Sequence, residues 1–408
     1  MSSKKDNLGC GCAHIPFSVI IILLGLGYWG FKNLDRLHLP RLNLAQRIPE
    51  QIDRFFPRTQ QQTAPDLTPG TPHPVGVSND YSEPEISIQT PTVQPTAESP
   101  VVPSPLATFP QTPWEKKQIR GIYLSRYQAT NNASEQAIRE RVRYYRQQGL
   151  NTIIHGVWGN GCTMYRSEVM QQTFGYPSCP NQFQDRWLDW LIDEAHKQGM
   201  QVHAYFEKGI KIDKNSPMFD WAISQRWIVP GVDRTYPGIE HYVLDVEIPE
   251  VGDLFKKISV EFVKKYPTID AVQWDDYLGY HAELPGKVDR TTHLTNFVRQ
   301  MRAEIEDANP DVSFDICHHN PYWGKRYFAA DWENWNVDRA FIQIYNDSNF
   351  DREIEYAVNY NGVAISDRQF HRFQELLDNT DIESILVFPA DGKPEETAAS
   401  VKKLLSDR

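Results

Sequence analysis

The 408-residue sequence is short of basic residues and lacks metal-binding motifs. Lysine and arginine number 42 against 53 aspartates and glutamates, which gives a formal net charge of -11. Because proteins bind nucleic acid by neutralising phosphates with clustered basic side chains, this balance argues against nucleic acid as a partner. No two histidines have the His-x-x-x-His spacing of a helical metal site, and His155, His203, His318 and His319 form no other ligand pattern. We expect neither a metal nor a cofactor.

Aromatic residues, in contrast, are plentiful. They make up 12% of the chain and include 11 tryptophans and 19 tyrosines. Such rings can be core residues, but they also provide the flat apolar faces on which sugar rings stack. The composition therefore favours a carbohydrate ligand.

Residues 15–31 form a long hydrophobic run near the N-terminus. The run contains no charged residue and ends close to Tyr28 and Trp29, just before Lys32. Its 17 residues are at the short end of what spans a bilayer. No small-residue cleavage site follows, and the aromatic pair is typical of a membrane interface. We predict a single-pass N-terminal membrane anchor at residues 15–31, preceded by a tail at residues 1–14.

The flanking charges and the other sequence features predict opposite orientations for this anchor. More basic residues follow the span than precede it, and by the positive-inside rule the C-terminal part would stay in the cytoplasm. The linker, the cysteine pair and the substrate class discussed below favour the opposite orientation, with the C-terminal domain extracytoplasmic (periplasmic), and we predict that one. The basic residues are Lys4 and Lys5 before the span, and Lys32, Arg36, Arg41 and Arg47 after it.

A low-complexity segment separates the anchor from the rest of the chain. Residues 32–113 begin with the basic flank and continue, from about Thr59 to Pro113, with many Pro, Thr, Ser and Gln residues. Hydrophobic periodicity is almost absent, which is typical of an unstructured linker. We predict that residues 114–408 form the folded domain.

Strand and helix patterns alternate throughout residues 114–408, which indicates a parallel sheet with crossover helices. An open doubly wound sheet would fit this alternation, but eight strands in roughly 290 residues fit a closed (β/α)8 TIM barrel better. The predicted strands are Ile119–Ser125, Thr152–Trp158, Gln201–Phe206, a strand starting at Ala271, Val312–Cys317, Ala340–Ile344, Gly362–Ile365 and Ile385–Phe388. The clearest predicted helices run from Ser134 to Gln148, Asp185 to Gln198, Pro249 to Tyr266 and Glu395 to Leu405.

Carboxylates follow two of these strands, and the active site of a TIM barrel lies at the carboxyl ends of its strands. Asp275 and Asp276 end the fourth strand, and Glu207 follows the third. Side chains alternate along a strand, so we expect only one of the two aspartates to face the barrel axis. The alternative roles are structural: an aspartate could cap the next segment, and Glu207 could pair with Lys208 or Lys211.

Other residues at the strand ends are candidates for substrate binding, with a packing role as the alternative for each aromatic. Amide and imidazole groups can bind sugar hydroxyls, and the aromatic side chains can stack on sugar rings. The candidates are His155, His318 and Gln343 for hydrogen bonding, and Trp158, Tyr277, Trp323 and Tyr345 for stacking.

Cys162 and Cys179 lie in one long loop after the second strand. They could form a disulfide, which requires an oxidising compartment. Two free thiols in a loop are the alternative.

From Arg120 to about Phe388 the chain resembles the glycosyl-hydrolase-like 10 family of bacterial barrel proteins. The resemblance implies a (β/α)8 barrel that hydrolyses glycosidic bonds, with bacterial cell-wall glycans as a substrate class. Two places depart from the family pattern: Asp245-Val246-Glu247 stands where Asp-Pro-Gly is usual, and Glu207-Lys208 where Asn-Pro is usual. The matching motifs are Arg120-Gly-Ile-Tyr-Leu, Gly149-Leu-Asn-Thr-Ile, Tyr165-Arg-Ser, the segments 194–205 and 244–251, Trp274-Asp-Asp-Tyr and Gln343-Ile-Tyr.

Glycoside hydrolysis needs one protonated and one ionised carboxyl group. The sequence therefore predicts a membrane-anchored glycoside hydrolase that acts on a polysaccharide, with Asp275 as general acid or nucleophile and Asp276 or Glu207 as its partner. A second hypothesis is an inactive glycan-binding barrel that positions cell-wall machinery. A third is a cytoplasmic hydrolase of small sugars, which free thiols at Cys162 and Cys179 would favour.

Overall fold

The computed structural model describes residues 111–125, 130, 132–180, 183–234, 239–281, 284 and 289–406. The predicted anchor at residues 15–31 and nearly all of the linker lie outside these residues. Within the part of the chain that is described, no helix is long and apolar enough to cross a membrane.

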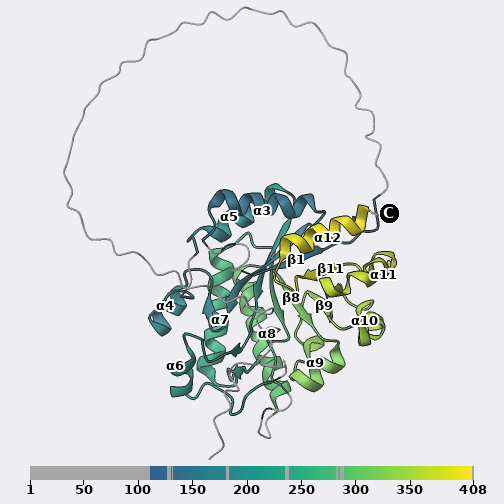
Figure 1. Cartoon of the computed structure of the whole chain (residues 1–408). Coiled ribbons are helices and arrows are strands. Elements are labelled where there is room, and N and C mark those ends of the chain that lie inside the picture. The colour runs from purple at the N-terminus through teal and green to yellow at the C-terminus, as the bar shows by residue number, and fades with distance from the viewer. Residues whose placement is uncertain are drawn as a thin grey trace, which may run out of the picture. The chain divides into compact units, whose positions relative to one another are not determined.

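Eight parallel strands close into a barrel, which confirms the predicted (β/α)8 fold. Each strand pairs with its neighbours in the order of the chain, and the last strand pairs back with the first. Figure 1 shows the helices arranged around these strands. The barrel strands are β1 (Arg120–Leu124), β2 (Thr152–Gly159), β4 (Gln201–Phe206), β7 (Ala271–Asp275), β8 (Ser313–His318), β9 (Arg339–Ile344), β10 (Gly362–Ser366) and β11 (Ile385–Phe388).

The helices follow the strands as crossover connections. The predicted cap of the first helix is present, because the Ser134 hydroxyl accepts a hydrogen bond from the backbone N–H of Ala137 at 3.2 Å. The helices are α3 (Glu135–Gln147), α4 (Glu168–Phe174), α5 (Trp187–Lys197), α6 (Phe219–Ser224), α7 (Pro249–Lys265), α8 (Arg290–Ala308), α9 (Pro321–Phe328), α10 (Phe350–Ala357), α11 (Phe373–Asp378) and α12 (Pro394–Ser406).

Two small additions were not predicted. The strand β3 (Cys162–Thr163) forms a hairpin with β2, and β5 (Lys211–Ile212) pairs antiparallel with β6 (Tyr242–Val243). Each has only two residues, which is too short to produce an alternating hydrophobic pattern. The additions extend the loops at the carboxyl ends of β2 and β4.

The hydrophobic core has two layers, one between the strands and the helices and one inside the barrel. In the outer layer, for example, the Trp274 and Phe206 rings stack with centroids 4.3 Å apart. The inner layer consists of Ile119, Tyr123, Ile154, Cys317, Phe341, Ala364 and Leu386. Both layers are filled with side chains, as in other TIM barrels.

A buried polar group fills the barrel near the amino ends of its strands. Arg339 forms a two-pronged ion pair with Asp315, in which its Nε and Nη2 atoms each lie 2.8 Å from a carboxylate oxygen. The Nδ1 atom of His203 lies 3.5 Å from the same carboxylate. This polar group closes the end of the barrel opposite the predicted active site.

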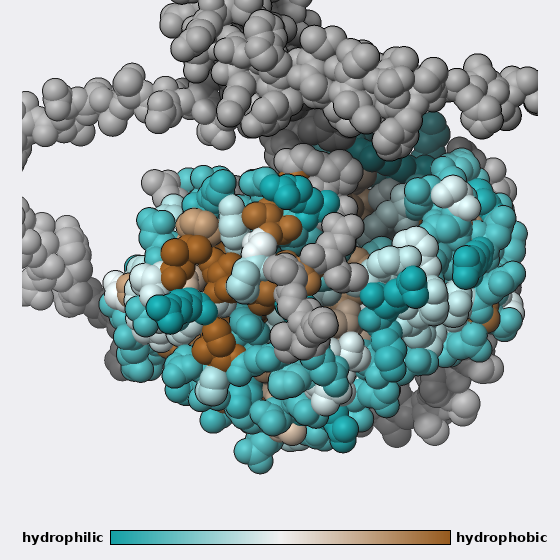
Figure 2. Space-filling view, turned by 90° about the horizontal axis from the view of Figure 1, so that it is seen from below, coloured by the Kyte–Doolittle hydropathy of each residue, from teal (hydrophilic) through white to brown (hydrophobic). Residues whose placement is uncertain are grey.

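The described surface in the view from below is mostly hydrophilic, with one group of hydrophobic residues (Figure 2).

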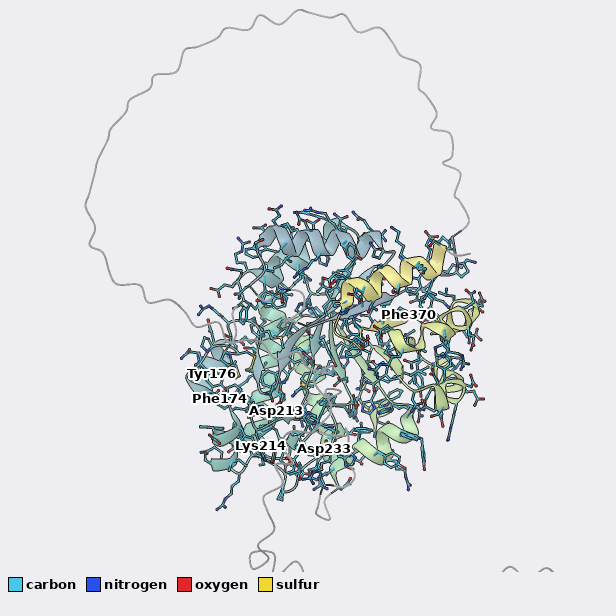
Figure 3. All side chains as sticks on the ribbon, viewed as in Figure 1. Phe174, Tyr176, Asp213, Lys214, Asp233 and Phe370 are labelled. Atoms are coloured by element: carbon cyan, nitrogen blue, oxygen red, sulfur yellow. A yellow bond between two sulfur atoms is a disulfide. The ribbon has the colours of Figure 1, made fainter. Side chains whose placement is uncertain are left out.

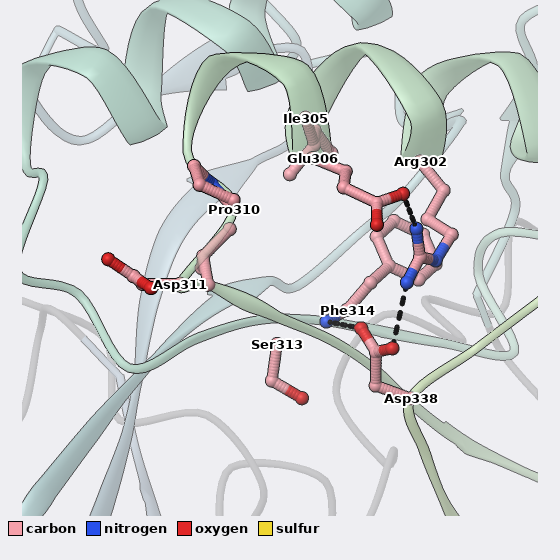
Figure 4. Close-up of a pocket in the computed structure, with 9 residues that line it drawn as sticks. Arg302, Ile305, Glu306, Pro310, Asp311, Ser313, Phe314 and Asp338 are labelled. Atoms are coloured by element: carbon pink, nitrogen blue, oxygen red, sulfur yellow. Dashed lines mark hydrogen bonds and ion pairs between the residues drawn. The ribbon is translucent and has the colours of Figure 1, made fainter.

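A cavity of about 270 Å³ lies near the amino end of β8, far from the residues predicted to be catalytic (Figure 4). Its Arg302 side chain already pairs with Glu306 and Asp338. This cavity is therefore not the predicted active site.

Candidate active site

The carboxyl end of β7 places two adjacent aspartates in the protein interior. Asp275 is the last residue of the strand and Asp276 follows it, and both are buried. The Oδ1 atom of Asp275 accepts a hydrogen bond from the backbone N–H of Tyr277 at 2.9 Å, and its Oδ2 atom accepts one from the Tyr205 hydroxyl. Tyr205 comes from β4, so the Asp275 carboxyl group is held from two strands.

Asp276 also contacts residues that point into the barrel. The expectation that only one of the two aspartates would face the barrel axis is therefore wrong. Its Oδ1 atom accepts a hydrogen bond from Gln343 Nε2 at 3.2 Å, and its Oδ2 atom lies 3.8 Å from His319 Nε2. Gln343 shares a strand face with Phe341 of the inner layer, so it points into the barrel. Because β7 ends at Asp275, strand alternation does not extend to Asp276.

The pKa of Asp275 lies well above its ordinary value. Burial is the main cause, and the neighbouring Asp276 charge adds to it, while the hydrogen bonds from Tyr205 and Tyr277 and the charge of Lys211 lower this pKa. Two carboxyl groups this closely coupled titrate as a pair. The pair therefore keeps a proton to higher pH than an isolated carboxyl group, and it can hold an acid and a carboxylate together.

Glu207 follows β4, on the same rim of the barrel. Its carboxylate lies against Gly156 of β2, because a Cβ atom at Gly156 would come within 2.9 Å of Glu207 Oε2. The Glu207 charge also raises the pKa values of Tyr205 and Tyr277, the two residues that hold Asp275, although burial is the main cause for both. The missing side chain at Gly156 thus makes room for a third carboxylate beside the pair.

The two lysines considered as partners of Glu207 form ion pairs with other residues. Lys208 Nζ lies 2.8 Å from Asp213 Oδ2, and Lys211 Nζ lies 2.9 Å from Asp233 Oδ2. Figure 3 labels Asp213 and Asp233 on the same side of the molecule.

The Lys211–Asp233 pair is completely buried, and the sequence analysis missed it. Lys211 Nζ lies 5.0 Å above the ring of Tyr277, and the backbone N–H of Ile210 donates to the Tyr277 carbonyl at 3.1 Å. The hairpin of β5 and β6 therefore holds Tyr277, whose own N–H holds Asp275. The two-residue strand β5 gave no sequence signal for this arrangement.

His155 and Trp158, predicted to bind substrate, are not at the barrel mouth. Both are buried on the outer face of β2. The His155 ring lies 4.5 Å from the ring of Trp187 in α5, and burial lowers the pKa of His155 to about 4. Trp158 Nε1 donates to the Gly209 carbonyl at 2.9 Å. These two predictions are therefore corrected to packing roles; the strand continues past them to Gly159.

Two of the remaining binding candidates lie beside the aspartate pair, and a third, His318, lies on the outer face of β8 because it alternates with Cys317 of the inner layer. Gln343 contacts Asp276 directly, as described above. Tyr277 is half-buried beneath Lys211. His318 is buried against Phe328, with ring centroids 5.4 Å apart, and burial lowers its pKa to about 3.

The other two candidates, Trp323 and Tyr345, belong to a group of exposed aromatics at one side of the barrel mouth. Among the described residues eight large hydrophobic side chains are exposed, and the five at the carboxyl ends of β8, β9 and β11 are all aromatic. The other three are aliphatic and lie elsewhere. We call the five the rim aromatics: Tyr322, Trp323 and Tyr327 of α9, Tyr345 after β9, and Phe388 at the end of β11.

Cys162 and Cys179 form a disulfide, with their Cα atoms 5.0 Å apart. The bond ties β3 to the segment that follows α4. It therefore fixes the long loop after β2. Among the described residues, no group of three or more His, Cys, Asp and Glu side chains is arranged to hold a metal ion.

Comparison with known proteins gives three related findings. Residues 118–290 match the glycosyl hydrolase-like 10 family. Glycosyl hydrolase DigH of Escherichia coli O6:H1 is 27% identical over 254 residues, 52% of this chain and 53% of the relative. DigH of E. coli K12 is 28% identical over 205 residues, 44% of this chain and 42% of the relative. The chain thus spans about half the length of these relatives.

A solved structure gives a weaker match. The GH36 α-galactosidase AgaA variant A355E from Geobacillus stearothermophilus aligns with a TM-score of 0.46 and 14% identity, over 73% of this chain and 42% of that one. This similarity is too low to bear on function.

The buried ion pair yields a stability prediction. Lys211→Met removes the positive charge that faces the buried Asp233 carboxylate, so the free energy of unfolding should fall by about 3–5 kcal/mol. The matched control is Lys214→Met, because the Lys214 side chain on the same segment is 64% exposed and should contribute little. Urea denaturation of the two variants compares the losses, and equal losses would contradict this account of Lys211.

Proposed function

Because residues 118–290 belong to the glycosyl hydrolase-like 10 family, we propose that this chain is a glycoside hydrolase that cleaves a polysaccharide by paired-carboxylate chemistry. One observation carries the proposal. Two adjacent, buried carboxyl groups lie at the carboxyl ends of the strands of a (β/α)8 barrel, and one of them has a raised pKa. In such a pair one carboxyl group can be protonated and act as the acid while the other is ionised and acts as the base or nucleophile.

In this proposal Asp275 is the general acid. Its raised pKa keeps a proton available for the oxygen of the leaving sugar. The ionised partner, Asp276 or Glu207, either attacks the anomeric carbon as the nucleophile, and water later releases the sugar, or takes a proton from the water that attacks this carbon. Tyr205 and Tyr277 hold Asp275 in place, and Gln343 does the same for Asp276.

The rim aromatics support a sugar substrate. Exposed aromatic rings beside a polar site provide apolar faces for stacking, and Tyr345 and Phe388 lie together, with centroids 6.0 Å apart. Burial and the neighbouring Cys317, Asp276 and Asp275 raise the pKa of Tyr345, while part of its side chain is exposed. Its ring can therefore contact a sugar while its hydroxyl remains near the catalytic pair.

We further propose that the substrate is a cell-wall glycan and that the barrel lies outside the cytoplasmic membrane. Both relatives described above are named glycosyl hydrolases and come from bacteria. The hydrophobic run at residues 15–31 would be the membrane anchor, followed by a linker that lets the barrel reach a wall polymer. The Cys162–Cys179 disulfide supports this location, because disulfides persist in oxidising compartments.

Replacing Asp275 tests the catalytic proposal. Asp275→Asn removes the proton donor but preserves the side-chain shape, so kcat on a susceptible glycan should fall by about 10²–10⁴-fold while glycan binding persists. Product release from a panel of glycans, including peptidoglycan strands with and without stem peptides, measures the effect. Asp311→Asn, an exposed aspartate at the opposite end of the barrel, is the control and should keep full activity. If neither wild type nor variant releases product although both bind the same glycan, the chain is a binding scaffold and not a hydrolase.

The pH dependence tests the assignment of the acid. The Tyr205 hydrogen bond lowers the pKa of Asp275, so Tyr205→Phe should raise it. Activity that needs the protonated form disappears as pH rises through this pKa; the alkaline limb of the kcat–pH profile should therefore move to higher pH in the variant. Tyr123→Phe is the control, because the Tyr123 hydroxyl donates to Gln273 and not to Asp275. If instead the acid limb moves to higher pH while the alkaline limb stays in place, Asp275 acts in its ionised form.

The location can be tested through the cysteines. When cells are lysed directly into denaturant with excess N-ethylmaleimide, Cys162 and Cys179 should remain unlabelled unless a reductant is added first, because both are buried in the folded protein and bonded to each other. Mass spectrometry of the peptides that contain them gives the readout. Free thiols at these positions before reduction would overturn the extracytoplasmic location.

A further inference from the structure

Helix α9 stands out because it exposes aromatic residues while its start is firmly anchored. The N-cap Asn320 accepts a hydrogen bond from the Trp323 N–H at 3.0 Å and donates from its side chain to both Glu353 oxygens at 2.8 and 2.9 Å. Yet Tyr322, Trp323 and Tyr327 are 52%, 38% and 38% exposed. The helix therefore presents three large rings to solvent on a fixed support.

These rings form one continuous surface with an arginine. Trp323 and Tyr327 are four residues apart, with ring centroids 5.3 Å from each other. The Arg326 guanidinium lies 5.9 Å from the ring of Tyr322 and 5.5 Å from the ring of Tyr327. Cation–π contacts of this kind orient the guanidinium while leaving its N–H edge for other partners.

The two cations of α9 differ in their partners. Lys325 is paired with Asp331 at 2.8 Å. Arg326 is exposed and forms no ion pair with a carboxylate among the residues that the structure describes. On a chain with a net charge of -11, an exposed arginine without an acidic partner beside three aromatic rings is a site suited to an anion.

The surface connects with the catalytic pair through a short series of contacts. His319 Nε2 lies 3.8 Å from Asp276 Oδ2, and the His319 ring centroid lies 6.2 Å from that of Trp323. Trp323 in turn contacts Tyr327, over which Arg326 lies. A glycan chain bound at Asp276 can therefore continue over α9.

We propose that α9 is a subsite for a sugar unit that carries a carboxylate, with Arg326 as the residue that recognises the charge. This inference rests on the proposed function, because it places one part of the glycan relative to Asp276. The planar guanidinium matches a carboxylate with two parallel hydrogen bonds, while Trp323 and Tyr327 contact the sugar ring. The subsite offsets the repulsion that an acidic glycan meets from the carboxylates at the barrel mouth.

Binding measurements on the full-length chain test the subsite. The background is Asp275→Asn, so that the probe is not cleaved. One probe is an oligosaccharide of N-acetylglucosamine in which every second sugar carries a lactyl ether with a free carboxylate, and the other is its methyl ester. Calorimetry should show that the acid binds roughly three- to tenfold more tightly than the ester, as expected for one charge-assisted contact near solvent.

The arginine and its neighbouring lysine provide matched variants. Adding Arg326→Gln should abolish the preference for the acid, whereas adding Lys325→Gln should retain it. Both changes remove one positive charge from the same helix, so a difference between them cannot come from net charge. Equal binding of acid and ester before these changes, or a preference that survives Arg326→Gln, would overturn the subsite and leave the hydrolase proposal intact. Binding of neither probe, together with no cleavage by the wild type, would remove both proposals.

Discussion

The burial of two adjacent carboxyl groups at the end of β7 is the constraint on which the rest of the site depends. Moving a carboxylate out of water is costly unless donors replace its hydration. The structure supplies such donors from β4, from the turn after β7 and from β9, through Tyr205, Tyr277 and Gln343. Fixed donors of this kind preorganise a catalytic group, so that little rearrangement is needed during reaction.

A second layer of contacts supports these donors. The β5–β6 hairpin holds Tyr277 from outside the barrel, through Ile210 and through the buried Lys211–Asp233 ion pair. A buried ion pair is weak evidence for stability, because its desolvation opposes its attraction. The contact of Lys211 with the Tyr277 ring instead relates the ion pair to the geometry and charge of the site.

The sequence was sufficient for the barrel but only partly for the site. Alternating strand and helix patterns located all eight strands, and β4 and β11 have the predicted bounds. Alternation failed where strands ended differently than expected: β2 runs past Trp158 with a bulge between Gly156 and Trp158, and β7 stops before Asp276, which turns inward. His155 precedes the bulge and faces outward because it alternates with Ile154 of the inner layer. The buried pair of Lys211 and Asp233 joins residues from a two-residue strand and a loop, for which no periodic pattern exists.

The polar group near the amino ends of the strands has a consequence for how a polymer can be bound. Arg339, Asp315 and His203 close the barrel beneath the inner layer, so nothing can thread through it. A glycan bound at the aspartate pair, as proposed, would have to enter and leave through the single opening at the carboxyl ends of the strands. Both products of a cleavage at the pair would therefore be released on the same side of the protein.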